Sequence, residues 1–135
     1  MRFVDTNILL YAISTEPDES SKRETANRLL GERDLALSTQ VLQEFYVQAT
    51  RSTRRDRITH RQAADLVLSF SRFPVQAATL DLVQSALEAC ERYVLSYWDA
   101  AIVEAARLLG CTELLSEDLN DGQSYGGVVV KNPFQ

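Results

Sequence analysis

Histidine and cysteine are nearly absent from this sequence of 135 residues, which contains one His and two Cys. Cys90 and Cys111 stand singly, with neither the CxxC spacing nor the neighbouring histidines of a zinc site. The sequence therefore argues against structural zinc and against a disulfide framework. Both cysteines are expected to be small buried hydrophobic residues.

Long apolar runs are also missing. No uninterrupted stretch reaches the roughly 18 residues of a membrane span, and Asp5 interrupts the N-terminal apolar run before a signal-peptide core can form. A cytoplasmic protein without a membrane segment is expected. Hydrophobic residues make up 45% of the chain and there are only five Gly and three Pro, which is typical of a globular protein. At this length, residues 1–135 are expected to form one domain.

Positive charge is scarce, since 14 Lys and Arg stand against 19 Asp and Glu, for a net charge of −5. This balance excludes a general, salt-driven attraction of the whole surface to nucleic acid. The segment from Arg51 to Arg61 nevertheless holds five arginines. Such a run is typical of a solvated helix end and loop, and contact with phosphates or an acidic partner is the alternative.

Short apolar segments alternate with helical patterns along the chain. Thr59 and Gln62 fit a capping box at the start of one helix, as do Ser96 and Asp99 at another. In the helix that Thr79 opens, the expected core positions are Leu80, Val83, Leu87 and Cys90. Strands are predicted at residues 2–4, 35–37, 75–78, 112–116 and 128–130. The alternation predicts an α/β fold with a mostly parallel central sheet of about five strands and helices on both faces.

Four acidic residues stand where this topology would bring them together. Asp5 follows the first strand directly, Asp118 lies two residues beyond the fourth, and Asp99 is in the first turn of a helix. All three are expected at the carboxyl edge of the sheet, where functional groups gather in parallel sheets. Glu44 flanks the buried face of its helix by about 100°, so its reach depends on helix rotation. Each acid also has a structural interpretation, as a cap, a turn residue or an exposed helix position.

Carboxylates gathered at one sheet edge repel one another unless a cation neutralises them. Mg²⁺ and Mn²⁺ prefer oxygen ligands, and the scarcity of His and Cys removes zinc as a rival. Such ions activate water and clamp phosphate oxygens during in-line displacement. The four acids together therefore predict a Mg²⁺ or Mn²⁺ site that acts on phosphate esters.

The helical Glu44 and three sequence blocks carry a resemblance to a known family. The blocks are Phe-Val-Asp-Thr-Asn-Ile-Leu at 3–9, Tyr-Trp-Asp-Ala-Ala-Ile-Val at 97–103 and Leu-Ser-Glu-Asp-Leu-Asn-Asp-Gly at 115–122. In these features the chain resembles the PIN-domain ribonucleases, and most closely the VapC-type toxins of bacterial toxin–antitoxin pairs. The resemblance implies a PIN-like three-layer sandwich. It also implies one or two metal ions held by Asp5, Glu44, Asp99 and Asp118, with polar support from Thr6, Asn7 and Ser116. Asp121 is a further candidate ligand, and Asp118 is preferred to it.

The same resemblance implies endonucleolytic hydrolysis of single-stranded or looped RNA by metal-activated water, leaving 5′-phosphate and 3′-hydroxyl ends. It implies a homodimer and a small antitoxin protein that inserts a segment near the acidic pocket. Arg51, Arg54 and Arg55 are then predicted to guide RNA. Tyr97 and Trp98 could stack on a base, but packing at the start of a buried helix is the favoured interpretation.

Other acid-pocket folds fit the sequence less well. A phosphatase of the haloacid dehalogenase kind has a second acid two residues after the first, and that position is Asn7 here. A receiver domain needs paired acids after the first strand and a lysine near a later one, and neither Lys22 nor Lys131 fits. The remaining alternatives are a housekeeping PIN-domain RNA-processing nuclease and a non-catalytic PIN-like interaction module.

Overall fold

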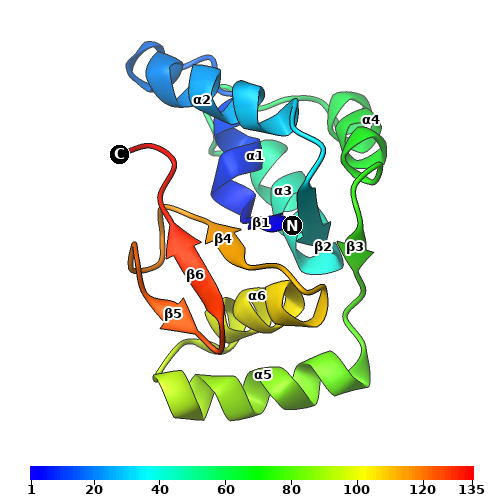
Figure 1. The fold of residues 1–135 in the computed structure, drawn as a ribbon. Coiled ribbons are helices and arrows are strands. Elements are labelled where there is room, and N and C mark those ends of the chain that lie inside the picture. Colours follow the sequence, from blue (N-terminus) through cyan, green and yellow to red (C-terminus); the bar gives the residue numbers. More distant parts are fainter.

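The computed structural model describes residues 1–135 and is built on a six-stranded sheet with the order β3-β2-β1-β4-β6-β5 (Figure 1). All neighbouring strands pair in parallel except β5 and β6, which are antiparallel. The predicted α/β fold with a mostly parallel sheet is therefore confirmed, with one strand more than expected. The strands are β1 (Arg2–Val4), β2 (Leu35–Ser38), β3 (Val75–Gln76), β4 (Glu113–Leu115), β5 (Ser124–Tyr125) and β6 (Val128–Lys131).

The additional strand, β5, belongs to a tight hairpin with β6 at the edge of the sheet. Gly126 and Gly127 form the turn with φ values of 59° and 94°, a left-handed conformation that glycine adopts without strain. Tyr125 is buried although its strand is only two residues long. A segment this short has no readable alternation, which is why the sequence did not predict it.

Helices cover both faces of the sheet (Figure 1). On one side α6 contacts four strands, and α5 runs along α6; on the other side α1 contacts α2 and α3, and α3 contacts α4. This arrangement is the predicted three-layer sandwich. None of the helices is both long and apolar enough to cross a membrane. The helices are α1 (Thr6–Ala12), the short 3₁₀ helix η1 (Pro17–Glu19), α2 (Ser20–Leu30), α3 (Thr39–Ala49), α4 (His60–Phe70), α5 (Leu80–Tyr93) and α6 (Tyr97–Leu108).

Side-chain caps set most helix starts. Thr59 and Gln62 form the complete predicted capping box at α4. At α6 only half of the predicted box forms, because Ser96 Oγ accepts from the Asp99 backbone N–H at 3.1 Å while the Asp99 carboxylate accepts nothing from Ser96. The capping-box prediction for Ser96 and Asp99 is therefore half wrong. Its failure leaves the Asp99 carboxylate free to face the sheet edge.

One cluster of 26 buried hydrophobic residues runs from β1 to β6. The prediction that Leu80 and Leu87 lie in the core is wrong, since their exposed fractions are 71% and 55%. Val83 and Cys90 are half-buried, whereas Cys111 is buried as predicted. The outer helix α5 instead meets α6 through small side chains, which let the two helices approach closely. This contact is made by Ala86, Ala89, Ala100 and Ala101.

The register between β1 and β4 determines where the site forms. Val4 pairs with Leu115, so the next residues along the two strands, Asp5 and Ser116, come out side by side at the carboxyl edge of the sheet. A backbone hydrogen bond of 3.0 Å from Asp5 N to Leu115 O continues the pairing to this point. Two polar residues that are 111 positions apart are thereby fixed next to each other.

Candidate active site

Asp5 lies at the end of β1, where it is also the N-cap of α1. Its exposed fraction is only 8%, and both carboxylate oxygens are held: Oδ1 accepts from Thr6 N at 2.7 Å, and Oδ2 from Ser116 Oγ at 2.8 Å. Burial raises the pKa of Asp5 to about 6, although these hydrogen bonds lower it. The nearby charges of Asp118 and Glu44 raise the pKa further. Asp5 is thus both the N-cap of α1 and a buried carboxyl group with a raised pKa.

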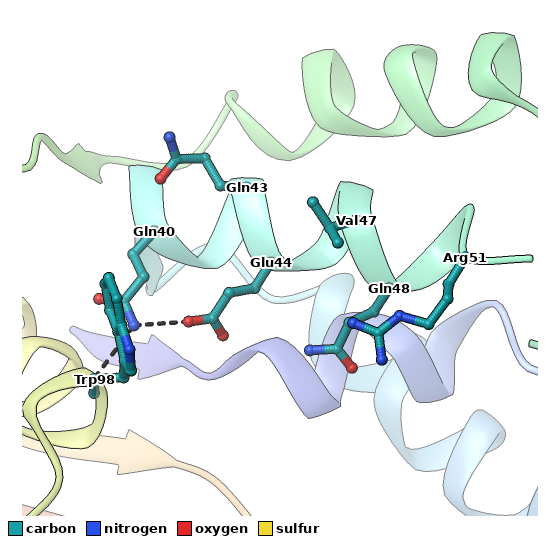
Figure 2. A pocket seen from close by; sticks show the side chains of 7 residues that line it. All are labelled: Gln40, Gln43, Glu44, Val47, Gln48, Arg51 and Trp98. Carbon is teal, nitrogen blue, oxygen red and sulfur yellow. Dashed lines mark hydrogen bonds between the residues drawn. The ribbon is translucent and has the colours of Figure 1, made fainter. Parts of the chain in front are cut away.

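Glu44 is turned toward the sheet edge by two hydrogen bonds. Thr6 Oγ1 donates to Glu44 Oε2 at 2.9 Å, and Gln40 Nε2 donates to Glu44 Oε1 at 2.7 Å (Figure 2). Because Thr6 belongs to α1 and Gln40 to α3, the contact between these helices fixes the rotation that the sequence left open. Thr6 therefore contacts both Asp5 and Glu44.

Asp118 follows β4 and is tied to the same edge. Asn7 Nδ2 donates to Asp118 Oδ2 at 3.0 Å and lies 3.4 Å from Ser116 Oγ. Ser116 Oγ also accepts from the backbone N–H of Asp118 at 3.1 Å. The buried Ser116 hydroxyl therefore links Asp5 to the loop that carries Asp118.

These acids open onto one cavity of about 150 Å³. Asp99 reaches it from the first turn of α6, so four segments that are distant in the sequence contribute one carboxylate each. The lining consists of the acids Asp5, Glu44, Asp99 and Asp118, the polar residues Thr6, Asn7, Gln40 and Gln48, and Leu10, Trp98 and Ile102. No basic side chain lines this cavity, so the charge in it is entirely negative.

This geometry coincides with a match to a known family. A family model for the PIN domain matches residues 2–120, which is most of the chain. The chain belongs to the PIN domain family. Its resemblance to PIN-domain proteins, first seen in sequence blocks, is thereby confirmed. A comparison of the chain with curated proteins found no match.

Solved structures share the fold of this PIN domain at low sequence identity. A toxin–antitoxin complex from Klebsiella pneumoniae is similar over 98% of both chains, with 24% identity and a TM-score of 0.70. VapC20 of Mycobacterium tuberculosis, described as a sarcin–ricin loop cleaving toxin, is 21% identical over 84% of this chain and 87% of its own, with a TM-score of 0.65. VapBC2 of Rickettsia felis, bound to a fragment of its promoter DNA, is 20% identical over 97% of both chains, with a TM-score of 0.65.

Asp121 of this PIN domain lies outside the acidic cavity. It is exposed, and its Oδ1 accepts from the backbone N–H of Asn132 at 2.8 Å. The carboxylate that the 115–122 block contributes to the cavity is that of Asp118. Asp118, which the sequence analysis preferred as a ligand, therefore lines the acidic cavity, and Asp121 does not.

The three candidate RNA-contacting arginines have different surroundings. Arg54 is largely buried, with Nε 2.9 Å from Asp56 and Nη2 donating to the Leu10 carbonyl at 3.4 Å. Arg55 is exposed and 3.7 Å from a Glu16 oxygen. Arg51 makes no ion pair and lies at the end of α3, close to the cavity residue Gln48.

Sequence reasoning missed Gln40 and Gln48, and it misjudged Trp98. Gln40, Glu44 and Gln48 follow one another at helical i, i+4 spacing, which is the signal that could have identified the two glutamines. Tyr97 is half-buried as expected. Trp98 is not packed in the core: its exposed fraction is 64%, and it lines the acidic cavity from the second position of α6.

The donor set of the cavity fits a hydrated divalent cation. It offers only oxygen and amide groups, and the buried Asn7 Oδ1 has no hydrogen-bond partner. No three acidic, His or Cys side chains lie close enough together to hold one ion directly. An ion that keeps several of its waters and binds one or two carboxylates directly suits this arrangement. A cation here would also offset the repulsion that raises the pKa of Asp5.

Proposed function

We propose that this PIN domain is a metal-dependent endoribonuclease that acts as the toxin of a toxin–antitoxin pair. The observation that carries the proposal is the convergence of Asp5, Glu44, Asp99 and Asp118 on one cavity at the carboxyl edge of the sheet. VapC20, which shares the fold, is described as cleaving the sarcin–ricin loop, and other structures with this fold are toxin–antitoxin assemblies. These relatives support RNA as the substrate and an antitoxin as the partner.

In this proposal Asp5, Glu44, Asp99 and Asp118 hold Mg²⁺ or Mn²⁺, directly or through water. A bound divalent ion supplies an acidified water molecule and neutralises charge on the scissile phosphate. The remaining contribution of the chain is orientation. Ser116 and the Thr6 backbone hold the two oxygens of Asp5, while Thr6 and Gln40 hold those of Glu44. The carboxylates are therefore positioned before substrate arrives, which lowers the cost of reorganisation during the reaction.

An RNA cleavage assay tests the catalytic proposal. The wild type with Mg²⁺ or Mn²⁺ is compared with Asp5→Asn and Asp99→Asn, and with Glu88→Gln, an exposed acid on α5, as the matched control. We expect both cavity variants to lose cleavage, the control to retain it, and EDTA to abolish it. Cleavage by Asp5→Asn and Asp99→Asn at the wild-type rate, or indifference to EDTA, would refute the proposal.

Two further measurements separate the alternatives. A non-catalytic interaction module would show no heat on titration with Mn²⁺, whereas the proposed site should bind the ion and lose it in Asp5→Asn. A toxin should arrest growth when expressed, unlike Asp5→Asn, whereas a housekeeping nuclease should cut RNA without arresting growth.

A homodimer and a small antitoxin protein are the proposed partners. Light scattering of the purified chain and co-purification with the product of a short upstream reading frame test them.

A further inference from the structure

A second pocket of about 380 Å³ adjoins the acidic cavity and shares lining residues with it (Figure 2). The shared residues are Gln40, Glu44, Gln48 and Trp98. One side of the pocket is the exposed face of α3. Trp98, from the start of α6, and Arg51, just beyond α3, mark its two ends in Figure 2. The pocket is thus an open extension of the proposed catalytic site.

The tryptophan at one end presents a large apolar ring to solvent. The exposed fraction of Trp98 is 64%, although its backbone and its ring each make one contact with the chain. Gln40 Nε2 donates to the Trp98 carbonyl at 3.2 Å, and the Tyr97 ring meets the indole edge-on with centroids 5.0 Å apart. The backbone at Trp98 is therefore tied to α3, while the indole contacts the Tyr97 ring and is otherwise largely uncovered by the chain.

The polar groups around the pocket are available to a ligand. The side-chain amides of Gln43 and Gln48 make no hydrogen bond within the chain, and each offers both a donor and an acceptor. Arg51 is the only cation in the pocket and has no ion-pair partner. An aromatic face, free amides and one unpaired cation are the groups that bind single-stranded RNA, through stacking, base edges and phosphate.

We propose that this pocket binds an unpaired nucleobase of the RNA substrate, stacked on Trp98 with its base edge toward the amides of α3. The inference rests on the proposed ribonuclease function and assigns its substrate-binding subsite. Four ionised carboxylates outweigh the charge of one divalent ion, so part of the affinity for a phosphodiester has to come from neighbouring groups. Base stacking is uncharged and tolerates any base sequence. Continuity of the pocket with the acidic cavity favours RNA over a protein segment as the occupant.

Intrinsic fluorescence tests the proposal directly, because Trp98 is the only tryptophan of the chain. The experiment uses the Asp5→Asn variant, which should not cleave RNA, in buffer that contains Mg²⁺. This variant is titrated with a single-stranded oligoribonucleotide and, separately, with a blunt duplex of the same sequence. We expect the single strand to quench Trp98 fluorescence strongly and the duplex to quench it weakly. Equal quenching by the two RNAs, or none by either, would overturn the proposal. If neither RNA quenches Trp98 fluorescence but the wild type still cleaves RNA, the subsite proposal fails and the proposed ribonuclease function stands.

Steady-state kinetics provide the second readout. Trp98→Ala should raise KM by about 5- to 150-fold, which corresponds to the loss of one base–aromatic stack, with kcat little changed. Trp98→Phe should recover most of the affinity, and Leu80→Ala, an exposed apolar residue on α5, should resemble the wild type. An unchanged KM in Trp98→Ala, or a change in oligomeric mass or partner binding with unchanged RNA affinity, would assign Trp98 to a protein contact instead.

Discussion

Ser116 Oγ lies 2.8 Å from Asp5 Oδ2, across the junction where β1 and β4 end. The same hydroxyl accepts from the backbone of Asp118, so one buried side chain connects two of the four cavity acids.

Ser116→Ala should move the pH dependence of cleavage. The Ser116 hydroxyl lowers the pKa of Asp5, so its loss raises that pKa and reduces the ionised fraction at mildly acidic pH. We expect cleavage at pH 6 to fall more than cleavage at pH 8. Rates measured across pH 5.5–8.5, with Ser85→Ala on α5 as the control, check this. A uniform loss at every pH would mean that Ser116 acts only through stability.

Asp5→Asn should stabilise the metal-free protein above pH 6. Burial raises the folded-state pKa of Asp5 from 3.8 to about 6, so the folded state prefers the protonated acid. Stability from this group is present below about pH 4 and is lost as the pH rises to about 6. The shift corresponds to roughly 1–3 kcal/mol. Urea unfolding in EDTA at pH 4 and pH 7.5 should show that the variant has a higher free energy of unfolding than the wild type only at pH 7.5. Mg²⁺ should stabilise the wild type more than the variant.

The arginine segment should divide into structural and RNA-binding residues. Arg54→Ala removes a largely buried ion pair with Asp56, so we expect it to lower the free energy of unfolding by about 1 kcal/mol or more. Arg51→Ala should leave stability unchanged and reduce the salt dependence of RNA binding by about one unit of slope. Thermal unfolding and binding titrations at several salt concentrations measure both effects. Unchanged RNA affinity and cleavage in Arg51→Ala and in Arg54→Ala/Arg55→Ala would refute a role of the segment in binding RNA.

Val94→Gly should stabilise the fold. Val94 ends α5 with φ 56° and ψ 49°, a left-handed conformation that costs a β-branched residue roughly 1–2 kcal/mol, and it is 90% exposed. Glycine removes this strain but raises the entropy of the unfolded chain, so a net gain of about 1 kcal/mol remains. Thermal unfolding should show a Tm higher by about 3–5 °C. Val94→Ala should raise the Tm by less. A Tm for Val94→Gly at or below that of the wild type would contradict the idea that the left-handed conformation of Val94 destabilises the fold.

Local signals explain what could be predicted from the sequence. Strand and helix order follow from apolar periodicity, and the cap at Thr59 depends on a partner three residues away. Asp5, Asp99 and Asp118 could be placed at one edge because parallel strands fix where their carboxyl ends lie. The rotation of Glu44 could not be predicted, because it depends on Thr6, which is 38 residues away.

The sequence by itself determined the α/β class, the order of elements and the edge at which the acids gather, since these depend on periodicity and on strand direction. Only the tertiary structure decided that Asp118 and not Asp121 enters the cavity, that α5 buries alanines instead of Leu80 and Leu87, and that Trp98 stands in solvent. Each of these depends on which face of a helix or loop meets a distant neighbour. Such contacts are set by packing between segments and leave no periodic trace in the chain.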